Sequence, residues 1–172
     1  MRRLGSAAGA IGRLTDTPLP VIAAINGYCY GGGARLAIAC DIRLASNTAT
    51  FRLPGAEYGL VVGAATLPRL VGAAKAKELI FTARKIDAAE ALSCGLVNSI
   101  HEPDQLMAAA MEMAETIAKQ SAGAIRESKR AIDAATLSDE ATEIENQANR
   151  ELRGSPEQVA RFRSATQKVT GR

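Results

Sequence analysis

Three consecutive glycines, Gly31, Gly32 and Gly33, stand between an apolar run and a stretch with helical spacing in this 172-residue chain. A glycine turn at the start of a helix lets backbone N–H groups point at a ligand with no Cβ in the way. An N–H group there, at the positive end of the helix dipole, stabilises an oxyanion. The alternative is that the glycines only form a tight turn. Their spacing is neither the dinucleotide GxGxxG nor a P-loop, so these two nucleotide-binding functions are not expected.

The cysteines and the histidine indicate no metal site and no disulfide scaffold. Cys29, Cys40 and Cys94 are odd in number and lack CxxC spacing, and His101 is the single histidine of the chain. These numbers argue against a zinc site. Cys29 and Cys40 have no histidine base nearby in the sequence, so we expect them to be small buried hydrophobes.

Composition narrows the class of ligand. The chain is 47% hydrophobic and 23% charged, as in one globular unit, and carries a net charge of +3. Residues 1–86 hold 11 Lys/Arg against 4 Asp/Glu, which favours an anionic ligand, although a solvated basic surface is the alternative. Nucleic acid is not expected because there is no Trp and there are few other aromatics.

Apolar runs are too short for a membrane span, and we expect a cytoplasmic protein.

Hydrophobic patterning predicts an α/β protein. The continuous apolar run 21–25, ended by Asn26-Gly27, is typical of a strand buried on both faces. We expect Asp87 and Asp104 to cap helices that follow them. Further strands are expected at 42–45, 49–53 and 96–100, the first two in the same sheet, and helices at 34–40, 63–70, 73–82, 104–119 and through most of 122–168. We therefore divide the chain into a mixed core at 1–103 and a helical segment at 104–172.

The region around the glycines resembles the crotonase (enoyl-CoA hydratase/isomerase) family. The residues that carry this resemblance are PVIAAINGYCYGGGARL at 20–36, CDIRLA at 40–45 and GLVN at 95–98, within a similarity that runs from residue 18 nearly to the end. The resemblance implies a spiral of ββα turns, here partial, with a carboxy-terminal helical segment that builds trimers or dimers of trimers. It also implies acyl-CoA thioester substrates, no metal and no cofactor beyond the CoA of the substrate. The family binds the thioester carbonyl between two backbone N–H groups that stabilise an enolate, and Gly32 matches one of these positions.

Two departures from the family pattern affect the expected chemistry. The hydratases carry glutamates where this chain has Arg35 and Gly55. Neither Arg nor Gly can activate water or take up a proton at pH 7, so hydration of a double bond is not expected. One carboxylate suffices for isomerisation or other enolate chemistry. Glu57, two residues past Gly55, is our candidate acid/base; the alternative is a solvated carboxylate or the partner of an arginine.

Arg35 has two interpretations. It either holds a carboxylate or phosphate of the substrate, or it fills the space of the missing glutamate and pairs with Glu57 or a neighbouring acid, which we favour.

Tyr28 and Tyr30 flank the glycines and are expected to pack rather than to donate hydrogen bonds. Asp41 is expected to form a local hydrogen bond at a helix end. The further predicted substrate-binding residues are Tyr30, Gly31, Gly33, Arg35, Gly55, Val62 and Lys168, the last matching basic residues that bind CoA phosphates.

Length gives a second hypothesis. Family members usually carry about ninety more residues before the strand at 21–25, including the loop that supplies the other oxyanion N–H. The chain is thus either part of a longer product or a shortened relative. Our preferred hypothesis is enolate stabilisation on an acyl-CoA at Gly32, by an isomerase or hydratase-like enzyme. The alternative is a non-catalytic or truncated crotonase-fold subunit that acts in assembly.

Overall fold

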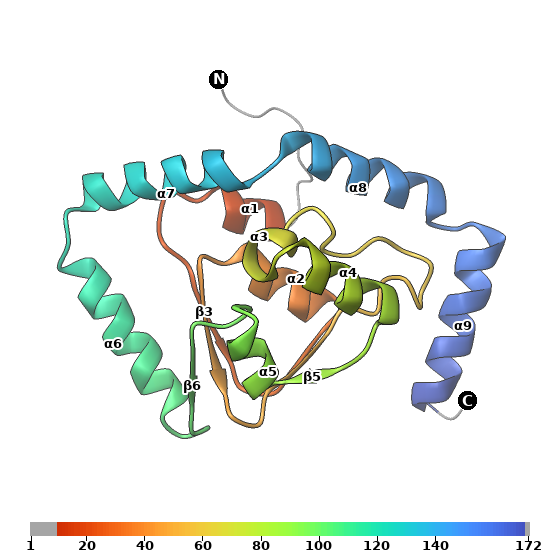
Figure 1. Ribbon diagram of the computed structural model, residues 1–172, viewed down its shortest axis with the longest axis horizontal. Coiled ribbons are helices and arrows are strands. Elements are labelled where there is room, and N and C mark those ends of the chain that lie inside the picture. Colours follow the sequence, from red (N-terminus) through yellow and green to blue (C-terminus); the bar gives the residue numbers. More distant parts are fainter. Residues whose placement is uncertain (1–9, 171–172) are drawn as a thin grey trace.

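The computed structural model describes the backbone of residues 10–170 and the side chains of residues 11–167 (Figure 1). Its strands are short, and its longer helices lie in the second half of the chain. The strands are β1 (Ile22–Ile25), β2 (Tyr28–Tyr30), β3 (Ile42–Ser46), β4 (Thr50–Arg52), β5 (Ile86–Asp87) and β6 (Ser99–His101). The helices are α1 (Ala10–Asp16), α2 (Gly32–Ala39), α3 (Pro68–Val71), α4 (Ala73–Thr82), α5 (Ala88–Ser93), α6 (Leu106–Ala118), α7 (Ala122–Thr136), α8 (Asp139–Leu152) and α9 (Pro156–Thr170).

The strands form two separate three-stranded sheets. One has the order β1-β3-β6 and is parallel, with Ile22 opposite Ile42 and Leu44 opposite Ser99. The other has the order β2-β4-β5, with β2 parallel and β5 antiparallel to β4. The prediction that the strands at 42–45 and 49–53 share a sheet is therefore wrong. The chain turns after Ser46, where Ala49 N–H donates to the Ser46 carbonyl at 3.0 Å, and β4 then pairs with β2.

The core lies between the sheets and helices α2 to α5. Leu67, Leu79, Ala45 and Ala91 are almost completely buried there, together with Phe51 of β4. A second small cluster forms where α6 packs on the first sheet, through Leu44, Leu106 and Ala110. The continuous apolar sequence of β1 is explained by its place in a parallel sheet, where strands pack on both faces.

One of the two predicted caps is present. Asp87 accepts the Glu90 N–H at 2.8 Å and caps α5, as predicted. Asp104 does not cap α6, because the helix begins after Gln105, which makes no side-chain cap. The sequence prediction failed because the turn before α6 is itself closed by backbone bonds, with Gln105 N–H and Leu106 N–H both donating to Glu102.

Helices α6 to α9 surround the mixed core on three sides (Figure 1). The proposed boundary at 103/104 falls between β6 and α6. Several large apolar side chains on these helices are exposed, namely Met107, Met111, Ile132, Ile144 and Phe162. None of the described helices has the length and apolar character needed to cross a membrane.

Candidate active site

The glycine turn opens helix α2 with backbone N–H groups that have no acceptor among residues 10–170. Gly31 has φ of +50°, a conformation that favours glycine, and its N–H donates to the Arg52 carbonyl at 3.1 Å. The first helical bond is from Arg35 N–H to the Gly31 carbonyl at 3.0 Å. The N–H groups of Gly32 and Gly33 therefore precede the hydrogen-bonded part of the helix. A Cβ at any of the three glycines would meet no heavy atom within 4 Å, so the turn faces open space.

Gly32 and Arg35 line a cavity of about 490 Å³. Its walls come from α1, α2, the segment 63–66 and α8, which supplies Thr142, Glu145 and Asn146. Leu36 and Ile38 add apolar surface. The cavity thus brings together the start of α2, a cation and a carboxylate.

Glu145 is the functional candidate that sequence reasoning missed. It is only 7% exposed, and its two carboxylate oxygens accept the N–H groups of Gly63 at 3.1 Å and of Ala65 at 2.9 Å. One turn further along α8, Asn149 bonds both the N–H and the carbonyl of Val61, at 3.0 and 2.8 Å. Helix α8 therefore fixes the segment 61–65 as a wall of the cavity. The available signal was weak, since it consisted of an acid and an amide four residues apart on one helix.

Arg35 projects into this cavity and does not pair with Glu57. Its side chain is 38% exposed, and the nearest carboxylate oxygen among the described residues is Oε1 of Glu145, at 3.9 Å from Nη2. Glu57 instead forms an ion pair with Arg52, five residues before it. Arg35 therefore pairs with a neighbouring acid, as one interpretation expected, but that acid comes from α8.

Glu57 lies beside the glycine turn without lining the cavity. Its partner Arg52 donates from Nε to the Ala83 carbonyl at 2.7 Å, and the Arg52 carbonyl accepts the Gly31 N–H. Glu57 is thus connected to the turn through a single residue. Its acid/base role stays a prediction.

The other predicted substrate-binding residues are dispersed. A Cβ at Gly55 would lie 2.7 Å from Cγ2 of Val62 and 2.8 Å from the Leu60 carbonyl, so the position of the second hydratase glutamate has no room for a side chain. Val62 packs against the core cluster. Tyr30 donates to or accepts from Thr50 Oγ1 at 2.8 Å, contrary to the expectation that it only packs. Lys168 lies in α9, with its side chain outside the described residues.

Tyr28 also differs from expectation. It is 85% exposed, and its ring contacts that of Tyr30 at a centroid distance of 5.4 Å. As the first residue of β2 it points away from the core, whereas the next residue, Cys29, is buried. Burial raises the pKa of the Cys29 thiol to about 11. Cys29 and Cys40 are both buried, as predicted, and an uncharged thiol is a poor nucleophile at neutral pH.

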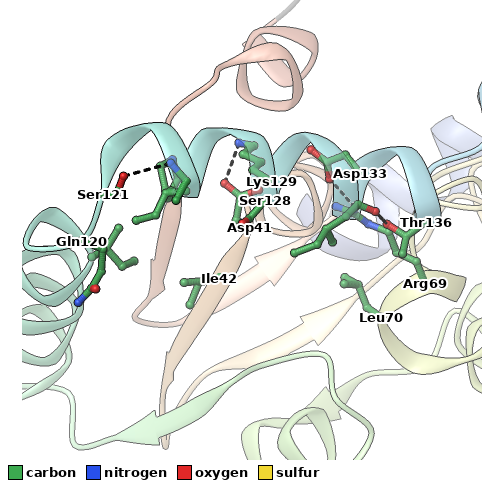
Figure 2. Close-up of a pocket in the computed structure, with 15 residues that line it drawn as sticks. Asp41, Ile42, Arg69, Leu70, Gln120, Ser121, Ser128, Lys129, Asp133 and Thr136 are labelled. Carbon is green, nitrogen blue, oxygen red and sulfur yellow. Dashed lines mark hydrogen bonds and ion pairs between the residues drawn. The ribbon is translucent and has the colours of Figure 1, made fainter.

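A second, larger cavity of about 640 Å³ lies under α7 (Figure 2). Figure 2 shows Lys129 of α7 beside Asp41 and Arg69 beside Asp133. The Lys129 Nζ to Asp41 Oδ2 distance is 2.8 Å, and the Arg69 Nη1 to Asp133 Oδ1 distance is 3.2 Å. Asp41 also accepts the Val21 N–H at 2.7 Å. It lies just after the end of α2, as expected, but these two partners of its side chain are 20 and 88 residues away in the chain, so the prediction of a local hydrogen bond is not met by them. The charges of this cavity are therefore paired with one another.

No cluster of three or more His, Cys, Asp or Glu side chains that would hold a metal ion occurs within the described part of the chain. The chemistry that this geometry supports is hydrogen bonding to a developing negative charge at Gly32.

Comparison with known proteins identifies the family. A sequence model described as "Enoyl-CoA hydratase/isomerase" matches residues 7–169. A short-chain-enoyl-CoA hydratase of Clostridium acetobutylicum is 47% identical over 124 residues, which are 70% of this chain and 48% of that protein. The putative enoyl-CoA hydratase/isomerase YngF of Bacillus subtilis is 44% identical over 132 residues, 75% of this chain and 51% of that protein. The chain thus spans about half the length of these curated relatives.

Solved structures agree with this result. The enoyl-CoA hydratase/isomerase from Pseudoalteromonas atlantica superimposes with a TM-score of 0.85 at 31% identity, covering 92% of this chain and 66% of that one. A monofunctional enoyl CoA isomerase from M. smegmatis gives a TM-score of 0.68 at 38% identity, over 76% of this chain and 64% of that one. The resemblance and the partial crotonase fold predicted from the glycine region are confirmed. The chain belongs to the enoyl-CoA hydratase/isomerase family of the crotonase superfamily.

Proposed function

We propose that this protein binds an acyl-CoA thioester in the 490 Å³ cavity and stabilises an enolate of its acyl group at the start of α2. The observation that carries the proposal is that the N–H groups of Gly32 and Gly33, at a turn facing open space, have no hydrogen-bond partner among the described residues. Gly32 itself lines the cavity together with Arg35 and Glu145. The relatives named as hydratases and isomerases of CoA esters support this substrate class.

The N–H of Gly32 is the proposed oxyanion donor. When a proton leaves the carbon next to a thioester carbonyl, negative charge moves onto the carbonyl oxygen. A preorganised N–H stabilises that charge, and loss of one such donor in enzymes costs on the order of 100- to 1000-fold in rate. The partial positive charge at the start of α2 acts in the same direction.

The proton itself requires a carboxylate, and two are near. Glu57 is the residue predicted from the sequence, and Glu145 lines the cavity and lies beside Arg35; Asp16 of α1 is a further carboxylate in the cavity wall. We propose isomerisation or a related enolate reaction rather than hydration, because Arg35 and Gly55 occupy the two hydratase glutamate positions and Gly55 has no room for a side chain. CoA enters as part of the substrate, and we expect no metal or further cofactor.

The test combines binding with proton exchange. Calorimetry compares a saturated acyl-CoA with free CoA, and NMR in D2O follows exchange of the α-protons of the bound acyl group, which reports enolate formation whatever the final product. We expect tighter binding of the acyl-CoA and measurable exchange. Exchange should fall in Glu57→Gln or in Glu145→Gln, whichever carries the proton. Equal binding of acyl-CoA and free CoA contradicts the proposal.

The second candidate is a non-catalytic crotonase-fold subunit that acts in assembly. It is favoured by the engagement of both carboxylates, Glu57 with Arg52 and Glu145 with two backbone N–H groups. It is also favoured by the exposed apolar side chains on α6 to α9. Acyl-CoA binding without any α-proton exchange supports this function. Light scattering on the same sample tests the expected trimer or dimer of trimers, and subcellular fractionation tests the expected cytoplasmic location.

A further inference from the structure

Arg35 is a cation with unused hydrogen-bonding capacity inside the candidate site. A guanidinium offers five N–H donors in a fixed fork. The Arg35 side chain makes no hydrogen bond to any described residue, and the one described carboxylate within 4.0 Å of it is that of Glu145, at 3.9 Å. Asp16 lines the same cavity without forming an ion pair with Arg35. By contrast, Lys129 and Arg69 in the larger cavity each hold a carboxylate within hydrogen-bond distance, and the one N–H of Arg69 found without a partner among the described residues, at Nε, is buried.

Glu145 does not satisfy Arg35. Each of its two oxygens already accepts a backbone N–H, from Gly63 and from Ala65, at a shorter distance than the 3.9 Å to Arg35. The carboxylate is therefore oriented toward the segment 63–65 rather than toward the guanidinium. The donor edge of Arg35 stays available to a ligand in the cavity that both residues line.

Position on the helix relates Arg35 to the oxyanion donor. Gly32 and Arg35 are three residues apart on α2, so they share one face and are separated by about 4.5 Å along the helix axis. A ligand whose thioester oxygen meets the Gly32 N–H therefore lies within reach of Arg35. A planar anion on a short spacer matches the guanidinium fork.

We propose that Arg35 recognises a second carboxylate on the acyl chain, so that the preferred substrates are CoA thioesters of short dicarboxylic acids, with one or two methylene groups between the two carbonyl carbons. This inference rests on the proposed function, since it places the thioester oxygen at Gly32. It assigns to Arg35 the role of a specificity-determining residue.

Matched ligand pairs isolate the carboxylate. Malonyl-CoA and isovaleryl-CoA have nearly the same shape and differ in the charged group, as do succinyl-CoA and 4-methylvaleryl-CoA. The quantity measured by calorimetry is the ratio of dissociation constants within each pair. We expect the dicarboxylic member to bind at least tenfold more tightly in one of the pairs.

Variants assign the preference to Arg35. Arg35→Met should bring the ratio close to one, and Arg35→Lys should give an intermediate value, because an ammonium keeps the charge without the fork. Lys77→Met, at an exposed position of α4, makes the same change in net charge and should leave the ratio as in the wild type. Thermal unfolding of each variant confirms that it is folded.

Three results overturn the proposal. Equal binding within both pairs, with acyl-CoA still tighter than free CoA, rejects the role of Arg35 and leaves the proposed function standing. A uniform loss of affinity in Arg35→Met for all thioesters and for free CoA shows that the arginine contacts a CoA phosphate instead. No tighter binding of any thioester than of free CoA rejects both this inference and the proposed function.

Discussion

The two cavities differ in how their polar groups are satisfied. The larger one, about 640 Å³, has two cations and two carboxylates in matched pairs. The smaller one, about 490 Å³, has the free N–H of Gly32 and the underused guanidinium of Arg35. Size alone would select the wrong cavity for anion chemistry. The larger cavity also has one donor without a partner among the described residues, Nε of Arg69, but this atom is buried. Unused donors that face open space, rather than volume, therefore distinguish the candidate active site.

The difference follows from what the charges hold in place. Lys129 bonds Asp41 and also the Leu19 carbonyl at 2.9 Å, so the ion pair attaches α7 to the segment before β1. In the smaller cavity this attachment is performed by Glu145 and Asn149 of α8. Arg35 is therefore not needed to hold an element in place.

The largest effect is expected for Glu145→Ala. The substitution leaves the N–H groups of Gly63 and Ala65 without acceptors, each at about 1 to 3 kcal/mol. We expect the free energy of unfolding in urea to fall by about 2 to 4 kcal/mol. Glu143→Ala, an exposed acid on the same helix, should change it by less than about 0.5 kcal/mol. Equal effects of the two variants would mean that α8 does not anchor the cavity wall.

The buried thiol of Cys29, which packs against α2, should make the stability of the protein depend on pH. Cys29 lies against Ala34 and Ala37, and burial raises its pKa from 9.0 to about 11. Between these values the unfolded chain has lost the proton and the folded chain retains it, so the free energy of unfolding falls as pH rises, by roughly 3 kcal/mol in all. Between pH 8 and pH 11, the free energy of unfolding measured in urea should fall more steeply with pH for the wild type than for Cys29→Ala. Identical slopes would contradict the burial of this thiol.

Gly55 and Gly33 differ in the room that each position leaves for a side chain, and alanine substitutions test this difference. Gly55→Ala places a Cβ against Val62 and the Leu60 carbonyl, so we expect the free energy of unfolding to fall by about 1 to 3 kcal/mol. Gly33→Ala meets nothing and lies within α2, so it should be neutral or stabilise by up to about 1 kcal/mol. Chemical denaturation of both variants measures the difference. A Gly55→Ala protein as stable as the wild type would show that the second hydratase glutamate can be accommodated.

The smallest effect is expected in the larger cavity. Lys129→Met removes one hydrogen-bond partner of Asp41, while the bond from the Val21 N–H to Asp41 remains. We therefore expect the free energy of unfolding to fall by about 1 kcal/mol. Acyl-CoA affinity should stay within about twofold of the wild type, measured by calorimetry. A tenfold loss of affinity at full stability would move the binding site to this cavity.

The strand, glycine turn and helix around residues 21–40 could be predicted because the signals are local. An apolar run, an Asn-Gly turn and consecutive glycines act within a few residues of one another, as does Asp87 on α5. The division into two sheets could not be predicted, because it depends on pairing between strands that are distant in sequence. Glu145 was missed because its partners are backbone N–H groups about 80 residues earlier in the chain, and backbone groups leave no sequence signal.

The central claim is that the Gly32 N–H hydrogen-bonds a thioester carbonyl, and its most direct test is the 13C resonance of an acyl-CoA labelled at that carbonyl. We predict a downfield shift on binding to the wild type that is kept in Gly32→Ala, which retains the N–H. The shift should be lost in Gly32→Pro, since proline fits the first position of a helix but has no N–H. A bound resonance at the position of the free thioester, or the same shift in both variants, would contradict the account.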